Sequence, residues 1–187
     1  MNIKLFCLFA ASIAFEASVL SGGVAWGTEN QVSAPEKPAN VPATLRVGAD
    51  RSLTVVAKAK GVQIYTCGPD KSNPAAFVWN FKAPEADLFN AGGNLIGKHY
   101  AGPTWEGIDG SKVVGQVSAS DKSVDPNAIT WLLLSAKSNS GAGLFGKTAN
   151  IQRLNTSGGK APVDGCDLAH SGSEARVPYT GAYYFYN

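Results

Sequence analysis

The chain has 187 residues and a formal net charge of +2, from 16 basic and 14 acidic side chains. This charge is too small, and the lysines are too scattered, to support nucleic-acid binding, which requires a basic patch. With 21 glycines, 10 prolines and few apolar residues at helical spacing, the composition also argues against a helical protein.

The N-terminal segment 1–25 is typical of a secretory signal peptide. Lys4 supplies a short positive start, residues 5–20 form an apolar stretch, and Ala25 ends a small-x-small sequence that signal peptidase accepts. We predict cleavage after Ala25, with cleavage after Gly27 as the alternative. The other interpretation is a retained membrane anchor, but a spanning helix needs ~20 apolar residues and Glu16 interrupts this stretch. The segment therefore predicts a secreted or periplasmic protein.

A polar leader and a β-rich domain follow the signal peptide. Residues 26–40 are polar and contain proline, which is typical of a flexible leader. Residues 41–187 are enough for one domain, and no segment there is long and apolar enough to cross a bilayer. We therefore expect no stable membrane span after signal removal.

Two cysteines remain after removal of the signal peptide, which contains Cys7. Cys67 and Cys166 form an even pair in an exported chain, and this predicts a disulfide. Such a bond closes a loop of about 100 residues and stabilises the fold by roughly 4–5 kcal/mol in the chain-entropy model. Metal ligation is the alternative, but the Cys-x-x-Cys spacing of metal sites is missing from the sequence.

The sequence predicts an all-β domain of about nine short strands, either a β-sandwich or a partly closed β-barrel. Gly61 is expected to end the first strand, and the segment 84–93 to hold one helical turn. The apolar segment 129–136 predicts a central strand that is buried on both faces. Alternation or β-rich composition marks the predicted strands at 53–60, 62–67, 77–82, 104–108, 111–117, 129–136, 151–155 and 176–186.

The dipeptide Asp109-Gly110 lies between two of these predicted strands, 104–108 and 111–117. Asp-Gly between strand-like runs is a strong hairpin signal, because a type I′ turn needs positive φ at both central residues. We therefore predict a hairpin in which Asp109 serves the turn.

Several motifs occur together in a fixed order: GVQIYTC (61–67), HYAGPTWEGIDGS (99–111), WLLL (131–134), IQRLNTSGGKAP (151–162), GC (165–166) and YYFY (183–186). This combination resembles the family catalogued as domain of unknown function 3455, over roughly residues 41–187. The resemblance implies a secreted single domain and no established activity. Some relatives carry a malate dehydrogenase label.

The segment 141–146 matches the dinucleotide-binding pattern G-x-G-x-x-G. That motif is meaningful only when a strand directly precedes it and a helix follows. Here the polar residues 137–140 separate it from the predicted strand, and the following residues lack a helical apolar stripe. We interpret it as a glycine-rich hairpin loop. The sequence therefore supports neither malate dehydrogenase activity nor a bound cofactor.

The densest group of polar and aromatic residues lies at 97–111 and includes His99, Glu106 and Asp109. His99 could act as a general base or bind a metal; alternatively it is a half-buried structural histidine that fixes the hairpin. If residues 97–101 pair with 104–108 across Gly102-Pro103, His99 approaches Trp105 or Glu106. The three polar residues are therefore catalytic candidates, with no metal site predicted.

Three further residues are candidates for ligand binding. Tyr100 and Trp105 could form an aromatic platform for a flat ligand, or could seal the edge of the core. Arg153 shares a predicted strand face with Ile151, so it is expected to point inward. An inward arginine needs a carboxylate, which Glu106 or Asp109 could supply, or backbone acceptors; the functional alternative is an arginine that binds an anion.

Two hypotheses about function follow. The first is a secreted or periplasmic module that binds a small molecule, a carbohydrate or an envelope partner; it requires that His99, Trp105 and Arg153 line one concave surface. The alternative is an extracellular hydrolase or lyase with His99 as acid or base, Glu106 as its partner and Arg153 as an anion clamp. The sequence does not predict the oligomeric state.

Overall fold

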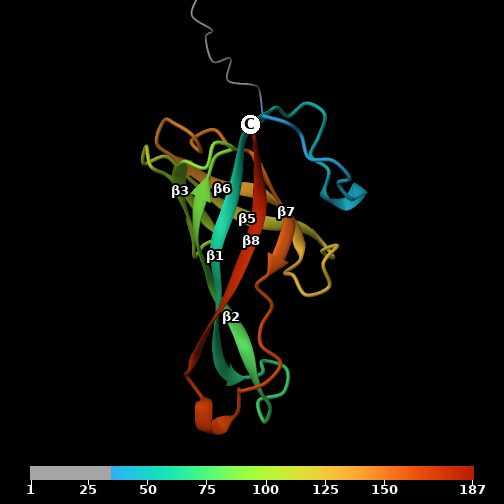
Figure 1. Ribbon diagram of the computed structural model, residues 1–187, viewed down its shortest axis with the longest axis vertical. Coiled ribbons are helices and arrows are strands. Elements are labelled where there is room, and N and C mark those ends of the chain that lie inside the picture. Colours follow the sequence, from blue (N-terminus) through green and yellow to red (C-terminus); the bar gives the residue numbers. More distant parts are fainter. Residues whose placement is uncertain (1–34) are drawn as a thin grey trace, which may run out of the picture. The chain divides into compact units, whose positions relative to one another are not determined.

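The computed structural model describes residues 35–187 (Figure 1). The predicted signal peptide, 1–25, and residues 26–34 of the predicted leader lie outside the described residues. Within 35–187, no helix has the length and apolar character needed to span a membrane.

Eight antiparallel strands form one closed barrel, in which each strand pairs with its sequence neighbours and β1 pairs with β8. The prediction of an all-β domain is confirmed, and the sheet closes completely. The elements in chain order are η1 (Ala43–Leu45), β1 (Leu53–Pro69), β2 (Phe77–Phe89), β3 (Leu95–Tyr100), β4 (Thr104–Gly107), β5 (Lys112–Asp121), β6 (Trp131–Ser140), β7 (Asn150–Gly158), η2 (Leu168–His170) and β8 (Glu174–Tyr186), where η marks a short 3₁₀ turn.

Strand β1 is one long strand, so the prediction that Gly61 ends a strand is wrong. Gly61 continues the pairing with both β2 and β8. A Cβ atom at this position would lie 2.1 Å from the carbonyl oxygen of Glu85. Glycine is therefore present because the backbones of β1 and β2 approach closely there, and not because the chain turns.

The helical turn predicted within 84–93 is also wrong, because β2 continues to Phe89. Ala86 and Leu88 are buried while Glu85 and Asp87 are exposed, which is the two-residue alternation of a strand. The register of β2 against β1 shifts just before Pro84. Proline is tolerated at such an irregularity, where the ladder is already interrupted.

The barrel interior and part of its outer surface are both packed with apolar side chains. Trp105, Tyr183 and Phe185 belong to the interior cluster. Tyr184 and Tyr186 belong to an outer cluster, together with Leu45 of η1. Successive residues of β8 point to opposite faces, so the aromatic C-terminal strand is buried on both sides.

Strand β6 confirms the prediction of a strand with two buried faces. Leu134 packs in the interior cluster and Trp131 in the outer cluster. The N-terminal segment that contains η1 makes this possible, because its apolar side chains cover the outside of the barrel at β6, β7 and β8.

The predicted hairpin at Asp109-Gly110 is formed by β4 and β5. Its turn differs from the predicted type I′, since Gly110 has positive φ (79°) and Asp109 does not. The N–H of Gly107 donates to the carbonyl of Ser111, and the N–H of Gly110 donates to the carbonyl of Gly107. The longer turn is stabilised by the Asp109 side chain, which accepts hydrogen bonds from Ser111.

Three strands continue beyond the others at one end of the barrel (Figure 1). Residues 62–69 of β1, 77–85 of β2 and 174–178 of β8 pair only with one another in the described part of the chain. We call this three-stranded extension the arm. The segment 159–173, between β7 and β8, runs along it.

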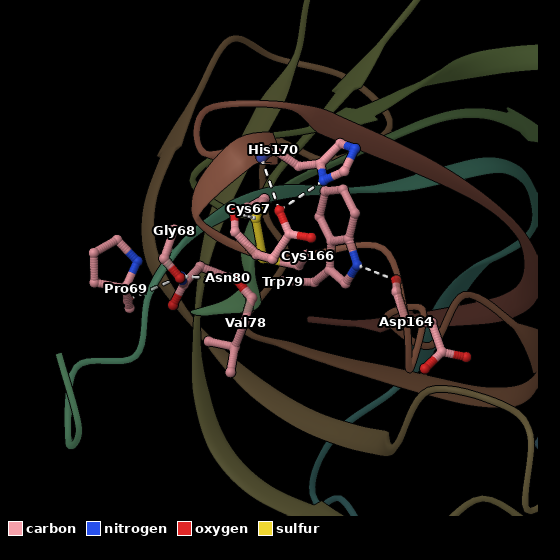
Figure 2. Close-up of a disulfide and its surroundings, with 10 residues drawn as sticks. Cys67, Gly68, Pro69, Val78, Trp79, Asn80, Asp164, Cys166 and His170 are labelled. Carbon is pink, nitrogen blue, oxygen red and sulfur yellow. Dashed lines mark hydrogen bonds and ion pairs between the residues drawn. A yellow bond between two sulfur atoms is a disulfide. The ribbon is translucent and has the colours of Figure 1, made fainter. Parts of the chain in front are cut away.

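A disulfide joins Cys67 of the arm to Cys166 of the segment 159–173, which confirms the predicted pairing. The two Cα atoms are 5.4 Å apart, a usual separation for a disulfide. Figure 2 shows the surrounding contacts, in which the indole N–H of Trp79 donates to the carbonyl of Asp164 over 2.8 Å. The N–H of Cys67 also donates to the carbonyl of Ser173, so the segment is attached to the arm at several points.

Candidate functional site

A cavity of about 610 Å³ opens at the end of the barrel from which the arm extends. We call it the mouth cavity. Its walls come from β1, β2, the end of β3, the β3–β4 turn, β5, the start of β6 with the residues before it, β7 and the residues after β7. Gly102 lines it at the turn; the apolar and aromatic lining residues are Tyr65, Phe81, Pro84, Ala101, Pro103, Val117, Ile129, Leu132 and Ala161, and the polar ones are Gln63, Lys82, His99, Thr130, Arg153 and Lys160.

Gln63 lies in the wall of the mouth cavity and is only 2% exposed. Its Nε2 atom is buried and has no hydrogen-bond partner among the described residues. The amide lies beside the hydroxyl of Tyr179, without a hydrogen bond of ordinary geometry to it. A buried polar group without a partner costs about 1–3 kcal/mol, so this donor is a costly feature of the cavity wall.

Arg153 reaches the mouth cavity from β7, as the strand alternation with Ile151 predicted. Its Nε and Nη2 atoms donate to the carbonyl of Thr130 over 3.2 and 2.9 Å. Of the partners that the sequence left open, the backbone acceptor is the one that forms, because Glu106 and Asp109 bind elsewhere and no salt bridge within 35–187 includes Arg153. The guanidinium charge is therefore held by a neutral carbonyl.

His99 lies at the base of the mouth cavity, and only 2% of its surface is exposed. Its ring stacks on the indole of Trp105, with centroids 4.4 Å apart and planes inclined by 14°. The Nδ1 atom lies 2.8 Å from the carbonyl oxygen of Thr104. A carbonyl only accepts, so Nδ1 carries the proton and Nε2 is an acceptor.

The environment of His99 holds the imidazole neutral. Burial lowers its pKa to about 3, and the charge of Arg153 acts in the same direction, while the bond to Thr104 opposes them. A group with so low a pKa is a weak proton acceptor at neutral pH. His99 can therefore accept a hydrogen bond from a ligand, but it is poorly suited to abstract a proton.

The segment after β7 closes one side of the mouth cavity with Lys160 and Ala161. The hydroxyl of Tyr65 donates to the carbonyl of Gly159 over 2.6 Å, and burial raises the pKa of this tyrosine. The Nζ atom of Lys160 donates to the carbonyl of Pro126. The Tyr65 bond and the disulfide hold this side of the cavity against the arm, and the Lys160 bond attaches it to the segment between β5 and β6.

Glu106 and Tyr100 lie outside the mouth cavity. His99 pairs with Trp105 across the β3–β4 ladder, so alternation places Glu106 on the opposite face and the hypothesised contact with His99 does not form. The Tyr100 hydroxyl donates to Glu106 over 2.7 Å, and Lys112 forms a salt bridge with Glu106 at 3.2 Å. The bond from Tyr100, followed by that from Lys112, lowers the pKa of Glu106.

Trp105 is 1% exposed and fills the barrel interior rather than forming an open platform. The interpretation that it seals the core matches this position. Its indole Nε1 has no hydrogen-bond partner in the described part of the chain. The sequence hypothesis required His99, Trp105 and Arg153 on one concave surface; His99 and Arg153 are there, and Trp105 lies directly beneath His99.

Asp109 supports the β4–β5 turn, in line with its predicted structural role. Its carboxylate accepts from the N–H and hydroxyl of Ser111 over 2.9 and 2.6 Å, and from the N–H of Leu144 over 2.8 Å. The hydroxyl of Ser111, and then the N–H of Leu144, lower the pKa of Asp109. Asp109 therefore joins this turn to the glycine-rich loop between β6 and β7.

The G-x-G-x-x-G segment, 141–146, lies in that loop, and strand β7 follows it instead of a helix. Phe145 is fully buried in the interior cluster, and its N–H donates to the hydroxyl of Ser111 over 3.0 Å. The loop therefore closes the barrel end opposite the arm. Its glycines serve this packing, because the helix N-terminus that binds a pyrophosphate in a dinucleotide site does not follow them.

No group of three or more His, Cys, Asp or Glu side chains arranged to hold a metal occurs within residues 35–187. His99, Glu106 and Asp109 are separated because the first faces the interior, the second faces outward and the third serves a turn. The polar group that does converge consists of Gln63, His99 and Arg153.

Sequence reasoning missed Gln63, Phe81, Lys82 and Lys160 as lining residues. For Gln63 a signal was present, because it alternates with Tyr65 and Cys67 on the face of β1 opposite Val62 and Ile64. A polar residue in an otherwise aromatic and apolar set indicates either a satisfied core amide or a ligand contact. The lysines offered no such signal, since surface lysines are common.

Neither a curated protein nor a solved structure matches the chain. A family model described as a protein of unknown function (DUF3455) matches residues 48–187, which include all eight strands, the disulfide and every lining residue of the mouth cavity. The chain belongs to this family.

Proposed function

We propose that this domain binds a small, mainly apolar molecule in the mouth cavity. The unpartnered Nε2 of Gln63 carries the proposal, because a buried donor that the fold leaves unsatisfied is satisfied when a ligand acceptor reaches it. If the Gln63 amide were fully hydrogen-bonded within the fold, it would need no partner from a ligand.

The size and chemistry of the cavity support the proposal. Small-molecule sites are typically clefts of ~300–1,000 Å³ with apolar walls and a few placed polar groups, and this cavity has about 610 Å³. Phe81 and Val117 line it and are 57% and 51% exposed. A bound molecule would cover this apolar surface and gain roughly 25 cal/mol per Å² removed from water.

The proposed location is the periplasm or the cell exterior. The signal-like segment 1–25 and the disulfide between Cys67 and Cys166 support this location, since disulfides persist in oxidising compartments. The fold leaves the mouth cavity open at the barrel end, so a ligand from the surroundings can enter without unfolding of the domain.

We do not extend the proposal to the hydrolase or lyase of the alternative hypothesis. That mechanism needs His99 as a base with Glu106 as its partner. The two side chains lie on opposite faces of the sheet, and burial lowers the pKa of His99 to about 3. Binding requires only that His99 is a neutral acceptor, which its surroundings favour.

Titration with 1-N-phenylnaphthylamine, an uncharged probe that fluoresces in apolar sites, tests the proposal. We expect a saturable rise in fluorescence with the oxidised domain. Ala161→Trp fills the cavity from its edge and should weaken probe binding at least about tenfold, which is 1.4 kcal/mol. Val163→Trp is the matched control, because Val163 is 95% exposed and does not line the cavity.

Failure of the wild type to bind the probe saturably contradicts the proposal. Binding of the probe by Ala161→Trp as tightly as by Val163→Trp contradicts it as well. The circular dichroism of both variants should match that of the wild type, so that loss of binding is not loss of folding.

A further inference from the structure

We propose that the ligand of the mouth cavity is an amphiphilic carboxylate: an apolar molecule whose single acid group is held by Arg153. This inference rests on the proposed function, because it names the chemical class of the molecule bound there.

The first argument is the charge balance of the cavity. Arg153, Lys82 and Lys160 line it, and no Asp or Glu lines it among the described residues. Lys82 forms a salt bridge with Glu174, whereas Lys160 donates to a backbone carbonyl. The cavity wall therefore carries positive charge that the described part of the protein leaves uncompensated, and an anion is the ligand that compensates it.

The second argument is the position of Arg153 in the cavity wall. Arg153 is half-buried in the polar part of the wall, which it shares with the buried Gln63 and His99. Its Nε and Nη2 atoms bind the carbonyl of Thr130, which fixes the guanidinium plane, and the guanidinium also lies beside the hydroxyl of Tyr183. A guanidinium held in this way is suited to the planar, singly charged carboxylate, and a partly desolvated pair gains more than one in water.

The neutral state of His99 adds to the same arrangement. A protonated imidazole beside Arg153 would require a second negative charge on the ligand. Burial keeps this ring neutral, so a single carboxylate satisfies the arginine. The donors of Gln63 and Arg153 then bind ligand oxygens, while Nε2 of His99 remains an acceptor for a ligand hydroxyl or a water molecule.

The remaining walls define the apolar part of the ligand. Phe81, Val117, Ile129 and Leu132 also line the cavity, and Leu132 pairs with Arg153 across the β6–β7 ladder. A linear alkyl chain and a flat aromatic system both fit such a surface. A fatty acid and an aromatic acid both carry a carboxylate on an apolar body. The experiment below distinguishes these two kinds of ligand.

Displacement of 1-N-phenylnaphthylamine by matched pairs of acid and alcohol tests the inference. The linear pair is decanoate and decan-1-ol; the flat pair is 2-naphthoate and 2-naphthol. We expect the acid of at least one pair to displace the probe at a concentration at least about tenfold below that of its alcohol, because a hydrogen bond to a charged group supplies such a preference. The preferred pair identifies the kind of apolar body.

Two variants locate the preference. Arg153→Met keeps the length of the side chain and removes its charge, so the acid and its alcohol should become equal within about threefold. Lys147→Met removes an exposed charge that does not line the cavity and should retain the full preference. Probe binding by each variant shows that its cavity is intact.

The outcomes separate this inference from the proposed function. If the wild type binds the probe but acids and alcohols displace it equally, the carboxylate assignment is wrong while the binding function stands. If the preference for the acid survives in Arg153→Met, the assignment of the acid group to Arg153 is wrong. If the wild type does not bind the probe and none of the four compounds binds by calorimetry, both proposals are wrong.

Discussion

Replacing Gln63 by methionine should stabilise the free domain. Methionine has a similar length and removes the buried Nε2 donor that has no partner. Leaving such a donor in the folded state costs about 1–3 kcal/mol, and this cost disappears in the variant. We therefore expect the free energy of unfolding to rise by about 1–3 kcal/mol, as is common when a residue kept for function is removed.

Gln152 provides the matched control, because it is also a glutamine that is 2% exposed. Its Nε2 donates to the carbonyl of Leu45 over 2.6 Å, and its Oε1 accepts from the hydroxyl of Tyr186 over 2.8 Å. Gln152→Met leaves both of these buried groups without a partner. At about 1–3 kcal/mol for each group, the control should lose roughly 2–6 kcal/mol.

Urea unfolding of the two oxidised variants and the wild type, followed by tryptophan fluorescence, measures both changes. The two substitutions are chemically identical, so the sign of the difference reports only how each amide is bonded. If Gln63→Met loses stability as Gln152→Met does, the Gln63 amide is satisfied in the folded protein. The observation that carries the proposed function would then be lost.

Reduction of the bond between Cys67 and Cys166, which are 99 residues apart, should lower the free energy of unfolding by about 4–5 kcal/mol on the chain-entropy model; urea titrations with and without a phosphine reductant measure it, and a loss below about 1 kcal/mol would contradict that account. Stability should also fall on acidification, because the folded protein keeps His99 neutral with a pKa of about 3 while the unfolded chain protonates it near ~6.5. Below about pH 6.5 the unfolded state therefore binds more protons than the folded state. The contribution of neutral His99 to the free energy of unfolding is complete well above this pH, and about 2 kcal/mol of it is lost between roughly pH 7.5 and 5. Urea midpoints across this range measure the loss, which should vanish in His99→Phe; a slope that survives there belongs to another group.

The local elements of this fold were largely predictable, because alternation is a local signal. Val55, Ala57 and Ala59 share the interior face that their spacing indicates. The wrong predictions concern residue types that occur in two different structural contexts. Gly61 is a strand breaker in isolation but a close-approach position between two strands, and the distinction depends on the partner strand, which only the fold provides.

The candidate site was predictable in part, for the same reason. Alternation placed Arg153 inward, and pairing of 97–101 with 104–108 placed His99 near Trp105 or Glu106, of which Trp105 is its partner; both placements need only local information. The neighbours of Arg153 could not be predicted, since Thr130 lies just before β6 and Gln63 lies in β1. Closure through β1 and β8 joins residues more than 100 positions apart, beyond the reach of any sequence window.

The position of the cavity follows from how the barrel interior is filled. Trp105 occupies the interior so closely that a Cβ atom on Gly115 would lie 2.9 Å from its ring. An interior of eight strands has room for packed side chains or for one small ligand, and here Trp105, Phe145 and Phe185 fill it. His99 stacks on Trp105 and forms the floor of the remaining space at the mouth. Of the residues at 97–111, His99 and Trp105 are therefore successive layers, in which Trp105 supports the surface that His99 presents to a ligand.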